Sequence, residues 1–233
     1  QYEEVQVEEV VNNCTHLSTQ QRDDLLQVLK RYPTLFNGQL GRYTDKTVHL
    51  EVDPSVKPRS SKAYTIPHKQ LDVFKQELDR LEKIGVFEKC GRSEWISGTF
   101  IIPKKDSRIR WITDFRALNK ALKRKVYPMP IISDILARRP GYKFLTKLDI
   151  SMHYYTLELD DSSKELTTFA TPFGLYRYRR LPMGISCAPD IAQDVMVKVL
   201  EDFMKDIEIY IDDIACFSND WPSHLQLLTN VLQ

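Results

Sequence analysis

The sequence has few cysteines and no long apolar run. Its four cysteines form no CxxC pair, which argues against a disulfide scaffold or a cysteine zinc site and favours reduced thiols inside a cell. The five histidines show no metal-ligand spacing. No apolar segment approaches the roughly 20 residues that span a bilayer, and the acidic residues 1–10 lack the basic start of a secretory signal. We therefore expect a globular protein without a membrane partner.

Charge is balanced over the whole chain but not along it. The net charge is +1, yet residues 100–147 contain 13 Lys and Arg against 3 Asp, a net of +10. A basic block inside a foldable sequence suggests a polyanion such as nucleic acid. Charge alone leaves a merely solvated basic surface as the alternative.

Hydrophobic periodicity predicts helices and strands in one chain, an α+β fold. A capping-box pattern at Ser18 and Gln21 predicts a helix to about residue 31, and an apolar stripe from Leu71 to Leu81 predicts a second, from Pro67 to just before Gly85. Two more helices are expected, one opening at Pro189 and one near Pro222. Strands are expected at 99–103, 109–113, 144–150, 154–159, 166–171, 175–178, 207–211 and 214–217.

The remaining segments carry weaker patterns. Residues 1–16 are expected to be a poorly ordered acidic lead-in, and residues 34–62 an extended connector. The helix that opens at Pro189 is predicted to present Ile191, Val195, Val199 and Phe203 on one face. The last helical pattern still runs at Gln233, which suggests a fragment of a longer protein.

Three acids stand at the ends of predicted strands. Asp149 ends one strand, and Asp212 and Asp213 form the tip of a hairpin. Adjacent carboxylates repel each other, and hard Mg²⁺ relieves that repulsion through carboxylate oxygens. Three such acids could hold two ions for an in-line phosphoryl displacement. The alternative is that an Asp pair only shapes a tight turn.

The chain resembles the reverse transcriptase of gypsy-type (Metaviridae) long-terminal-repeat retrotransposon Pol polyproteins, which are related to the retroviral enzymes. The resemblance runs from about Leu35 to the C-terminus and rests on motifs in the expected order. They are Arg80-Leu-Glu-Lys-Ile-Gly-Val-Phe-Glu, Lys104-Lys-Asp-Ser-Arg-Ile-Arg, Asp114-Phe-Arg-Ala-Leu-Asn, Tyr127-Pro-Met-Pro with Asp134, Lys147-Leu-Asp-Ile, Thr168-Phe-Ala-Thr-Pro-Phe-Gly, Leu181-Pro-Met-Gly, Ala188-Pro and Tyr210-Ile-Asp-Asp.

The resemblance implies a site, residue by residue. Asp149, Asp212 and Asp213 match the catalytic, metal-binding aspartates. Lys104 and Arg110 match the fingers residues that contact the incoming triphosphate. Tyr154 resembles the steric gate that excludes a ribose 2′-OH, and Met183 with Gly184 matches the loop near the substrate. The implied nucleic-acid contacts are Tyr210 and six basic residues: Lys120, Lys123, Arg124, Lys125, Arg138 and Arg139.

Three positions depart from the family pattern. Met183 stands where retroviral enzymes have Gln, Ala192 replaces the Phe usual before Gln193, and His153 replaces a small residue just before Tyr154. These changes affect the expected sugar pocket and nucleotide affinity. They leave the expected metal site intact.

The resemblance further implies a right-hand polymerase of fingers and palm without its thumb, the palm being an antiparallel sheet backed by helices. The expected ranges are a connector at 1–56, fingers at 57–124 and 157–187, and palm at 125–156 and 188–233. The implied activity is RNA- and DNA-templated addition of deoxynucleotides to a primer 3′-OH, with two Mg²⁺ ions (or Mn²⁺) as cofactors. Thumb, RNase H and integrase domains are expected in a longer polyprotein, located in a cytoplasmic particle or in the nucleus.

Three other functions compete with this interpretation. The first is a nucleic-acid-binding fragment that no longer polymerises, which would bind template without extending a primer. The second is an RNA-templated RNA polymerase, against which Tyr154 argues. The third is an unrelated structural domain, which predicts that the three acids are scattered in space.

Overall fold

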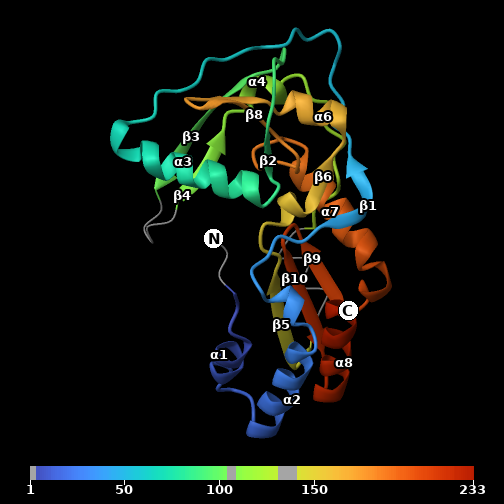
Figure 1. The fold of residues 1–233 in the computed structure, drawn as a ribbon. Coiled ribbons are helices and arrows are strands. Elements are labelled where there is room, and N and C mark those ends of the chain that lie inside the picture. Colours follow the sequence, from blue (N-terminus) through green and yellow to red (C-terminus); the bar gives the residue numbers. More distant parts are fainter. Residues whose placement is uncertain (1–3, 104–108, 131–140) are drawn as a thin grey trace. The chain divides into compact units, whose positions relative to one another are not determined.

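The computed structural model describes residues 4–103, 109–130 and 141–233 (Figure 1). The chain divides into two compact units. Unit 1 comprises residues 1–40, 127–151 and 192–233, and unit 2 comprises residues 41–126 and 152–191. Within the described ranges, every helix is too short or too polar to traverse a lipid bilayer.

Unit 1 contains a three-stranded antiparallel sheet in the order β5, β10, β9. Its strands and helices are β5 (Phe144–Asp149), β9 (Ile207–Tyr210), β10 (Asp213–Ser218), α1 (Val7–Asn12), α2 (Thr19–Lys30), the short η1 (Pro33–Leu35) and η3 (Glu201–Phe203), α8 (Trp221–Leu232) and most of α7 (Ala188–Val199). Among the described elements, α7 alone has residues in both units.

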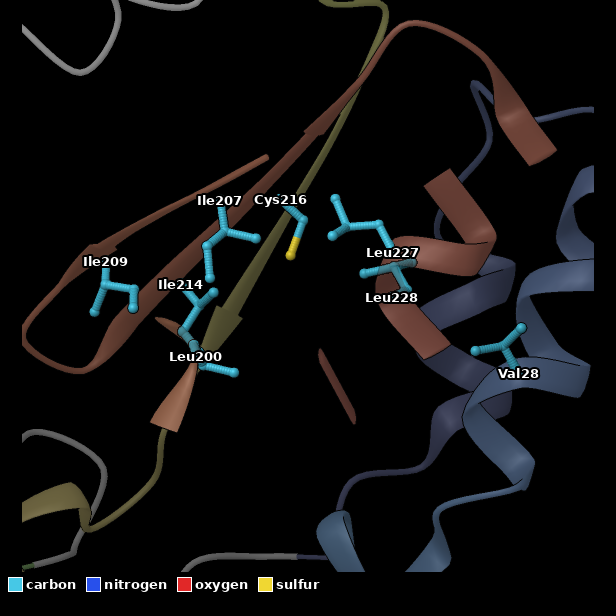
Figure 2. Close-up of a cluster of buried hydrophobic side chains, with 8 residues drawn as sticks. All are labelled: Val28, Leu200, Ile207, Ile209, Ile214, Cys216, Leu227 and Leu228. Atoms are coloured by element: carbon cyan, nitrogen blue, oxygen red, sulfur yellow. The ribbon is translucent and has the colours of Figure 1, made fainter. Parts of the chain in front are cut away.

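One face of this sheet is covered by helices. Side chains alternate between the two faces of a strand, and Ile207, Ile209, Ile214 and Cys216 point to the same buried side. Val28 of α2 and Leu227 and Leu228 of α8 complete that core (Figure 2). The other face carries Lys147 and Asp149 of β5 and Asp213 of β10. Asp149 and Asp213 thus lie on the face opposite the hydrophobic core.

Unit 2 contains a five-stranded mixed sheet in the order β2, β8, β7, β3, β4, in which only the β3–β7 pair of these is parallel. Its elements are β1 (Tyr43–Val48), α3 (His68–Lys83), β2 (Phe87–Lys89), β3 (Ser97–Pro103), β4 (Ile109–Thr113), α4 (Arg116–Asn119), η2 (His153–Thr156), β6 (Leu157–Leu159), α6 (Asp161–Leu166), β7 (Phe169–Thr171) and β8 (Gly174–Tyr178).

Aromatic side chains fill the core of unit 2. Phe74 of α3 packs on Trp111 of β4 with ring centroids 4.5 Å apart, and Phe87 meets Tyr178 edge-on at 4.7 Å. Large flat rings bury much apolar area and favour tilted or edge-on pairs. They hold α3 against the sheet.

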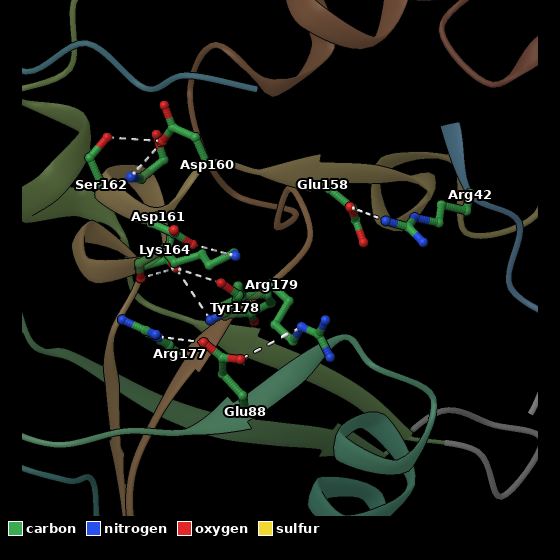
Figure 3. A network of polar contacts seen from close by, with 12 residues as sticks. Arg42, Glu88, Glu158, Asp160, Asp161, Ser162, Lys164, Arg177, Tyr178 and Arg179 are labelled. Carbon is green, nitrogen blue, oxygen red and sulfur yellow. Dashed lines mark hydrogen bonds and ion pairs between the residues drawn. The ribbon is translucent and has the colours of Figure 1, made fainter. Parts of the chain in front are cut away.

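Ion pairs join neighbouring strands of unit 2 (Figure 3). Glu88 of β2 accepts from the Arg177 Nε at 2.6 Å and lies 3.6 Å from the Arg179 Nε. Arg42, just before β1, donates to Glu158 of β6 at 3.0 Å. These partly exposed pairs each contribute little to the free energy of folding. They accompany the backbone pairing of β2 with β8 and of β1 with β6.

The best-marked helices match their predictions because their caps are local. Ser18 accepts from the Gln21 backbone N–H and Gln21 reaches back to the Ser18 N–H, the reciprocal capping box at the start of α2. At the end of α3, Gly85 has φ +78°. Its N–H donates to the Glu82 carbonyl and the Val86 N–H to the Leu81 carbonyl, which is a Schellman motif.

Both weakly patterned segments contain structure that was not predicted. The expected disordered lead-in includes α1, and the expected connector includes β1. Strand β1 pairs in parallel with β6, more than a hundred residues later. Such a pairing leaves little signal in the local sequence, since four of its six residues are exposed.

The prediction of a strand at 154–159 is wrong in its first half. Residues His153–Thr156 form the 3-10 helix η2, entered through Met152 with φ +56°, and only Leu157–Leu159 is a strand. Similarly, Leu166 ends helix α6 instead of beginning a strand. The Asp160 side chain accepts from the Ser163 N–H at 2.8 Å and caps that helix.

The apolar face predicted along α7 does not coincide with the most buried side of the helix and extends past its end. Val199 is 51% exposed, whereas Ala192 and Gln193 are almost fully buried. The helix ends at Val199, and Phe203 belongs to η3. The polar Gln193 was not expected in the core, and its burial needs hydrogen-bond partners, which it has.

Candidate active site

The three predicted aspartates lie at one end of the unit 1 sheet. Asp149 is the last residue of β5, Asp213 is the first of β10, and the two are direct partners in the antiparallel register. Partners in register place their side chains on the same face. Asp212 precedes Asp213 in the loop between β9 and β10. The acids are therefore gathered, which contradicts the hypothesis of a structural domain with scattered acids.

The hairpin tip has a strained backbone. Tyr210 pairs with Asp213, so Ile211 and Asp212 form a two-residue loop. Ile211 has φ +57°, a left-handed conformation that is rare for a β-branched residue and costs about 1–3 kcal/mol. The Asp212 carbonyl accepts from the Ile150 N–H at 2.8 Å, which ties the tip to the residue that follows Asp149.

Like charge accumulates at this end of the sheet. Partial burial, followed by the negative charges of Asp212 and Asp213, raises the pKa of the Asp149 carboxyl above its ordinary value. The Lys147 ammonium lies 2.9 Å from the Asp213 Oδ2. This hydrogen bond and the surrounding carboxylates raise the pKa of Lys147. Lys147 thus offsets part of the negative charge of the three acids.

The donor chemistry of this cluster suits hard divalent cations, which prefer carboxylate oxygens. As the side chains stand, the described residues contain no group of three His, Cys, Asp or Glu arranged to hold a metal ion. The Asp213 carboxylate is turned to the Lys147 ammonium.

The predicted substrate loop of unit 2 is fixed by an amide side chain. Gly184 has φ +90°, which a side chain would strain. The Asn119 Nδ2 donates to the Gly184 carbonyl at 2.8 Å, and the Ser186 N–H donates to the Asn119 Oδ1 at 2.8 Å. Met183, next to Gly184, is half exposed. The loop therefore has a defined backbone with an accessible apolar side chain.

Comparison with known proteins decides the family. The family model described as reverse transcriptase (RNA-dependent DNA polymerase) matches residues 102–233. The chain belongs to the reverse transcriptase family. The resemblance carried by the sequence motifs is confirmed.

Relatives of this reverse transcriptase chain include retrotransposon polyproteins. It is 30% identical over 216 residues to the retrovirus-related Pol polyprotein from transposon opus of Drosophila melanogaster, covering 89% of this chain and 21% of that protein. It is 29% identical over 231 residues to the polyprotein from transposon 412 of the same organism, covering 89% and 19%. The chain spans about a fifth of the length of the curated relatives it matches.

The fold agrees with solved reverse transcriptases. The native Prototype Foamy Virus protease-reverse transcriptase matches with a TM-score of 0.87 at 26% identity, over 97% of this chain and 31% of that one. The predicted α+β fold of fingers and palm is thereby confirmed.

Several of the basic residues predicted to contact nucleic acid form ion pairs with acidic residues of this reverse transcriptase chain. Lys123 and Lys125 both pair with Glu51, at 2.9 and 3.4 Å. Arg124 binds the buried Asp190 through two nitrogens, at 2.6 and 3.2 Å. Exposed lysine pairs are weak and exchangeable, whereas the Arg124 guanidinium is committed to a carboxylate that is 2% exposed.

The remaining predicted contacts are placed as follows. Arg110 is exposed on β4, opposite Ile102. Tyr154 lies in η2, with its ring stacked on His153 at a centroid distance of 6.0 Å. Tyr210 ends β9 and Lys120 is exposed after α4. The predictions for Lys104, Arg138 and Arg139 lie outside the described residues.

Three residues with contacts at these sites received no role from the sequence. They are Lys147, which pairs with Asp213, Asn119, which clamps the Gly184 loop, and Gln193, whose amide bonds the hairpin backbone. Lys147 and Asn119 lie inside quoted motifs. Lys147 lies two residues before Asp149 in the same strand, so alternation places both side chains on one face and could have indicated the pairing. For Asn119 and Gln193, no local pattern indicates which groups an amide side chain will bond.

Proposed function

We propose that this chain carries the polymerase site of an RNA-directed DNA polymerase that adds deoxynucleotides to a primer 3′-OH. The observation that supports it most is the register that sets Asp149 opposite Asp213, with Asp212 tied to the adjoining Ile150 N–H. Foamy viral protease-reverse transcriptase has been solved in complex with an RNA/DNA hybrid and with double-stranded DNA. By analogy, the substrate here is a primer annealed to an RNA or DNA template.

In this proposal Asp149, Asp212 and Asp213 hold two Mg²⁺ ions, or Mn²⁺ in their place. When bound, such ions lower the pKa of an attacking hydroxyl and neutralise the departing pyrophosphate. The chain's own part is to hold three carboxylates together at one end of the unit 1 sheet. Lys147 supplies compensating positive charge beside Asp213.

The substrate roles are proposed by the same resemblance. Arg110 and Lys104 would bind the triphosphate, since cationic donors suit phosphate oxygens. Tyr154 would exclude a 2′-OH, and the Met183–Gly184 loop would border the nucleotide. The palm would comprise residues 125–156 and 188–233 and the fingers residues 57–124 and 157–187, with Tyr210, Lys120 and the other basic residues along the primer-template.

Primer extension by the full-length protein tests the proposal. With dNTP and Mg²⁺, the Asp212→Asn variant is expected to lose at least about a hundredfold in kcat, because charge stabilisation in the transition state is lost. Asp194→Asn is the matched control. It removes a surface carboxylate paired with Lys198 on α7, and it should retain parental activity. Equal activity of parent and Asp212→Asn would refute the polymerase assignment.

The same experiment tests a second candidate function. The second candidate is a protein that binds nucleic acid without copying it. That hypothesis predicts template binding by the full-length parent with no extension at any Mg²⁺ or Mn²⁺ concentration.

A further inference from the structure

A buried amide from α7 bonds the hairpin that carries Asp212. Gln193 is 2% exposed. Its Nε2 donates to the Ile209 carbonyl at 2.9 Å, and its Oε1 accepts from the Ile211 N–H at 2.7 Å. An amide suits this place because it offers a donor and an acceptor together. One side chain thus bonds the backbone on both sides of Tyr210.

Both bonds act beside the strained residue of the tip. Left-handed backbone at a β-branched residue persists only where its surroundings over-determine it. Gln193 bonds the N–H of Ile211 itself, and the Ile150 N–H bonds the carbonyl of Asp212, the next residue. The strained position is therefore held from α7 on one side and from the end of β5 on the other.

We infer that Gln193 is a positioning residue that holds Ile211 in its left-handed conformation and so sets the direction of the Asp212 and Asp213 carboxylates. The inference rests on the proposed function for the claim that this direction governs metal binding. Gln193 acts through the backbone and is given no contact with substrate or ion.

The variant Gln193→Met tests this role, since it keeps the side-chain length and removes both bonds. Mn²⁺ is the probe, followed by electron paramagnetic resonance. Residues that orient metal ligands typically contribute 10–100-fold to metal affinity, so we expect Mn²⁺ affinity to fall by about tenfold or more. In primer extension by the full-length protein, kcat should fall while the KM for dNTP changes by less than about twofold.

Thr146→Val is the matched control for a general loss of stability. The Thr146 Oγ1 bonds the buried His224 Nε2 at 2.8 Å, so this variant also breaks a polar contact in the unit 1 core, away from the hairpin tip. It should keep parental Mn²⁺ affinity. An equal loss of affinity in both variants would overturn the inference.

A double-mutant cycle separates positioning from packing. Gly adopts positive φ without steric cost, so Ile211→Gly relieves the strain that Gln193 is inferred to resist. The loss of Mn²⁺ affinity on Gln193→Met should then be smaller in the Ile211→Gly background. Additive losses would mean that Gln193 and residue 211 act independently, and would overturn the inference.

Hydrogen exchange keeps this test apart from the proposed function. If the parent binds no Mn²⁺, the proposed metal site fails. The positioning role of Gln193 is then tested by hydrogen exchange of the Ile211 amide alone. If Gln193→Met increases the exchange rate over the parent more at Ile211 than at the core residue Ile214, the positioning role of Gln193 is supported. Unchanged protection at Ile211 overturns it.

Discussion

At the scale of single residues, the candidate site gathers acids that repel one another. The pKa of Asp149 is raised by partial burial and by Asp212 and Asp213, and Lys147 offsets only part of that charge. Folding therefore places Asp149 where its ionised form is disfavoured. Residues selected for chemistry commonly reduce stability in this way.

We predict that Asp149→Asn stabilises the metal-free chain at pH 7. An acid whose pKa is raised by folding binds its proton more tightly when folded, so the ionised form carries a penalty above the folded-state pKa. That penalty disappears below about pH 4, where unfolded aspartate is protonated too. The gain in free energy of unfolding should be below about 1 kcal/mol, because the site is solvent-accessible.

Urea unfolding at pH 7 and below pH 4 checks this pH dependence. Asp194→Asn removes a carboxylate paired with Lys198 and is not expected to gain stability. A gain for Asp149→Asn of the same size at both pH values would show that charge is not its cause.

Gly184 and Ile211 both have positive φ, and the strain of that backbone conformation is accommodated differently at each. At Gly184 the sequence itself relieves the strain, because glycine has no Cβ. At Ile211 the strain remains, and a distant Gln193 bonds the backbone instead. The first could be read from sequence, since glycine in a loop signals unusual backbone. The second could not.

At the scale of elements, the start of α7 depends on a residue predicted to serve another purpose. Asp190 lies in the first turn of α7, where a negative charge is favoured by the helix dipole. It is 2% exposed, and Arg124 supplies its counter-charge. Hydrogen bonding to Asp190 raises the pKa of Arg124. Arg124 therefore anchors this helix whether or not it also touches phosphate.

We predict that Arg124→Met destabilises the chain, because it removes the counter-charge of the buried Asp190 carboxylate. The loss is smaller than for a fully buried pair because half of the Arg124 side chain is exposed. Adding Asp190→Asn should recover much of it, since the buried negative charge that Arg124 balances is then gone. A double-mutant cycle in urea measures the coupling, and strictly additive effects would contradict the prediction.

Elements differed in how well the sequence predicted them. Helices α2 and α3 were predicted because their caps lie within a few residues of their ends. Strand β1 was missed because its partner β6 is remote. The burial of Gln193 in α7 was not predicted, because a periodicity of apolar residues does not reveal that a glutamine is buried to bond a neighbouring hairpin.

At the scale of the whole molecule, the basic block of residues 100–147 predicts salt-dependent binding of primer-template. On duplex DNA, each neutralised phosphate contributes about −0.9 to the slope of log affinity against log salt. Lys120→Ala in the full-length protein should reduce the slope by roughly one. Lys46→Ala, an exposed lysine of β1, should leave it unchanged. Filter binding at several salt concentrations makes the comparison, and equal slopes for Lys120→Ala and the parent would exclude a phosphate contact.

The sequence by itself determined the family and most of the secondary structure. Ordered short motifs, helix caps and alternating strands are local, and a single chain displays them in full. The motifs of the family also pointed to Asp149, Asp212 and Asp213 as the candidate metal ligands.

Tertiary structure alone decided which groups face one another. The pairing of Asp149 with Asp213, the lysine on Asp213, the commitment of Arg124 to Asp190 and the glutamine that bonds Ile211 all join residues separated in the chain. Side-chain hydrogen bonds and ion pairs act over about 3 Å, and only folding brings such partners within that distance.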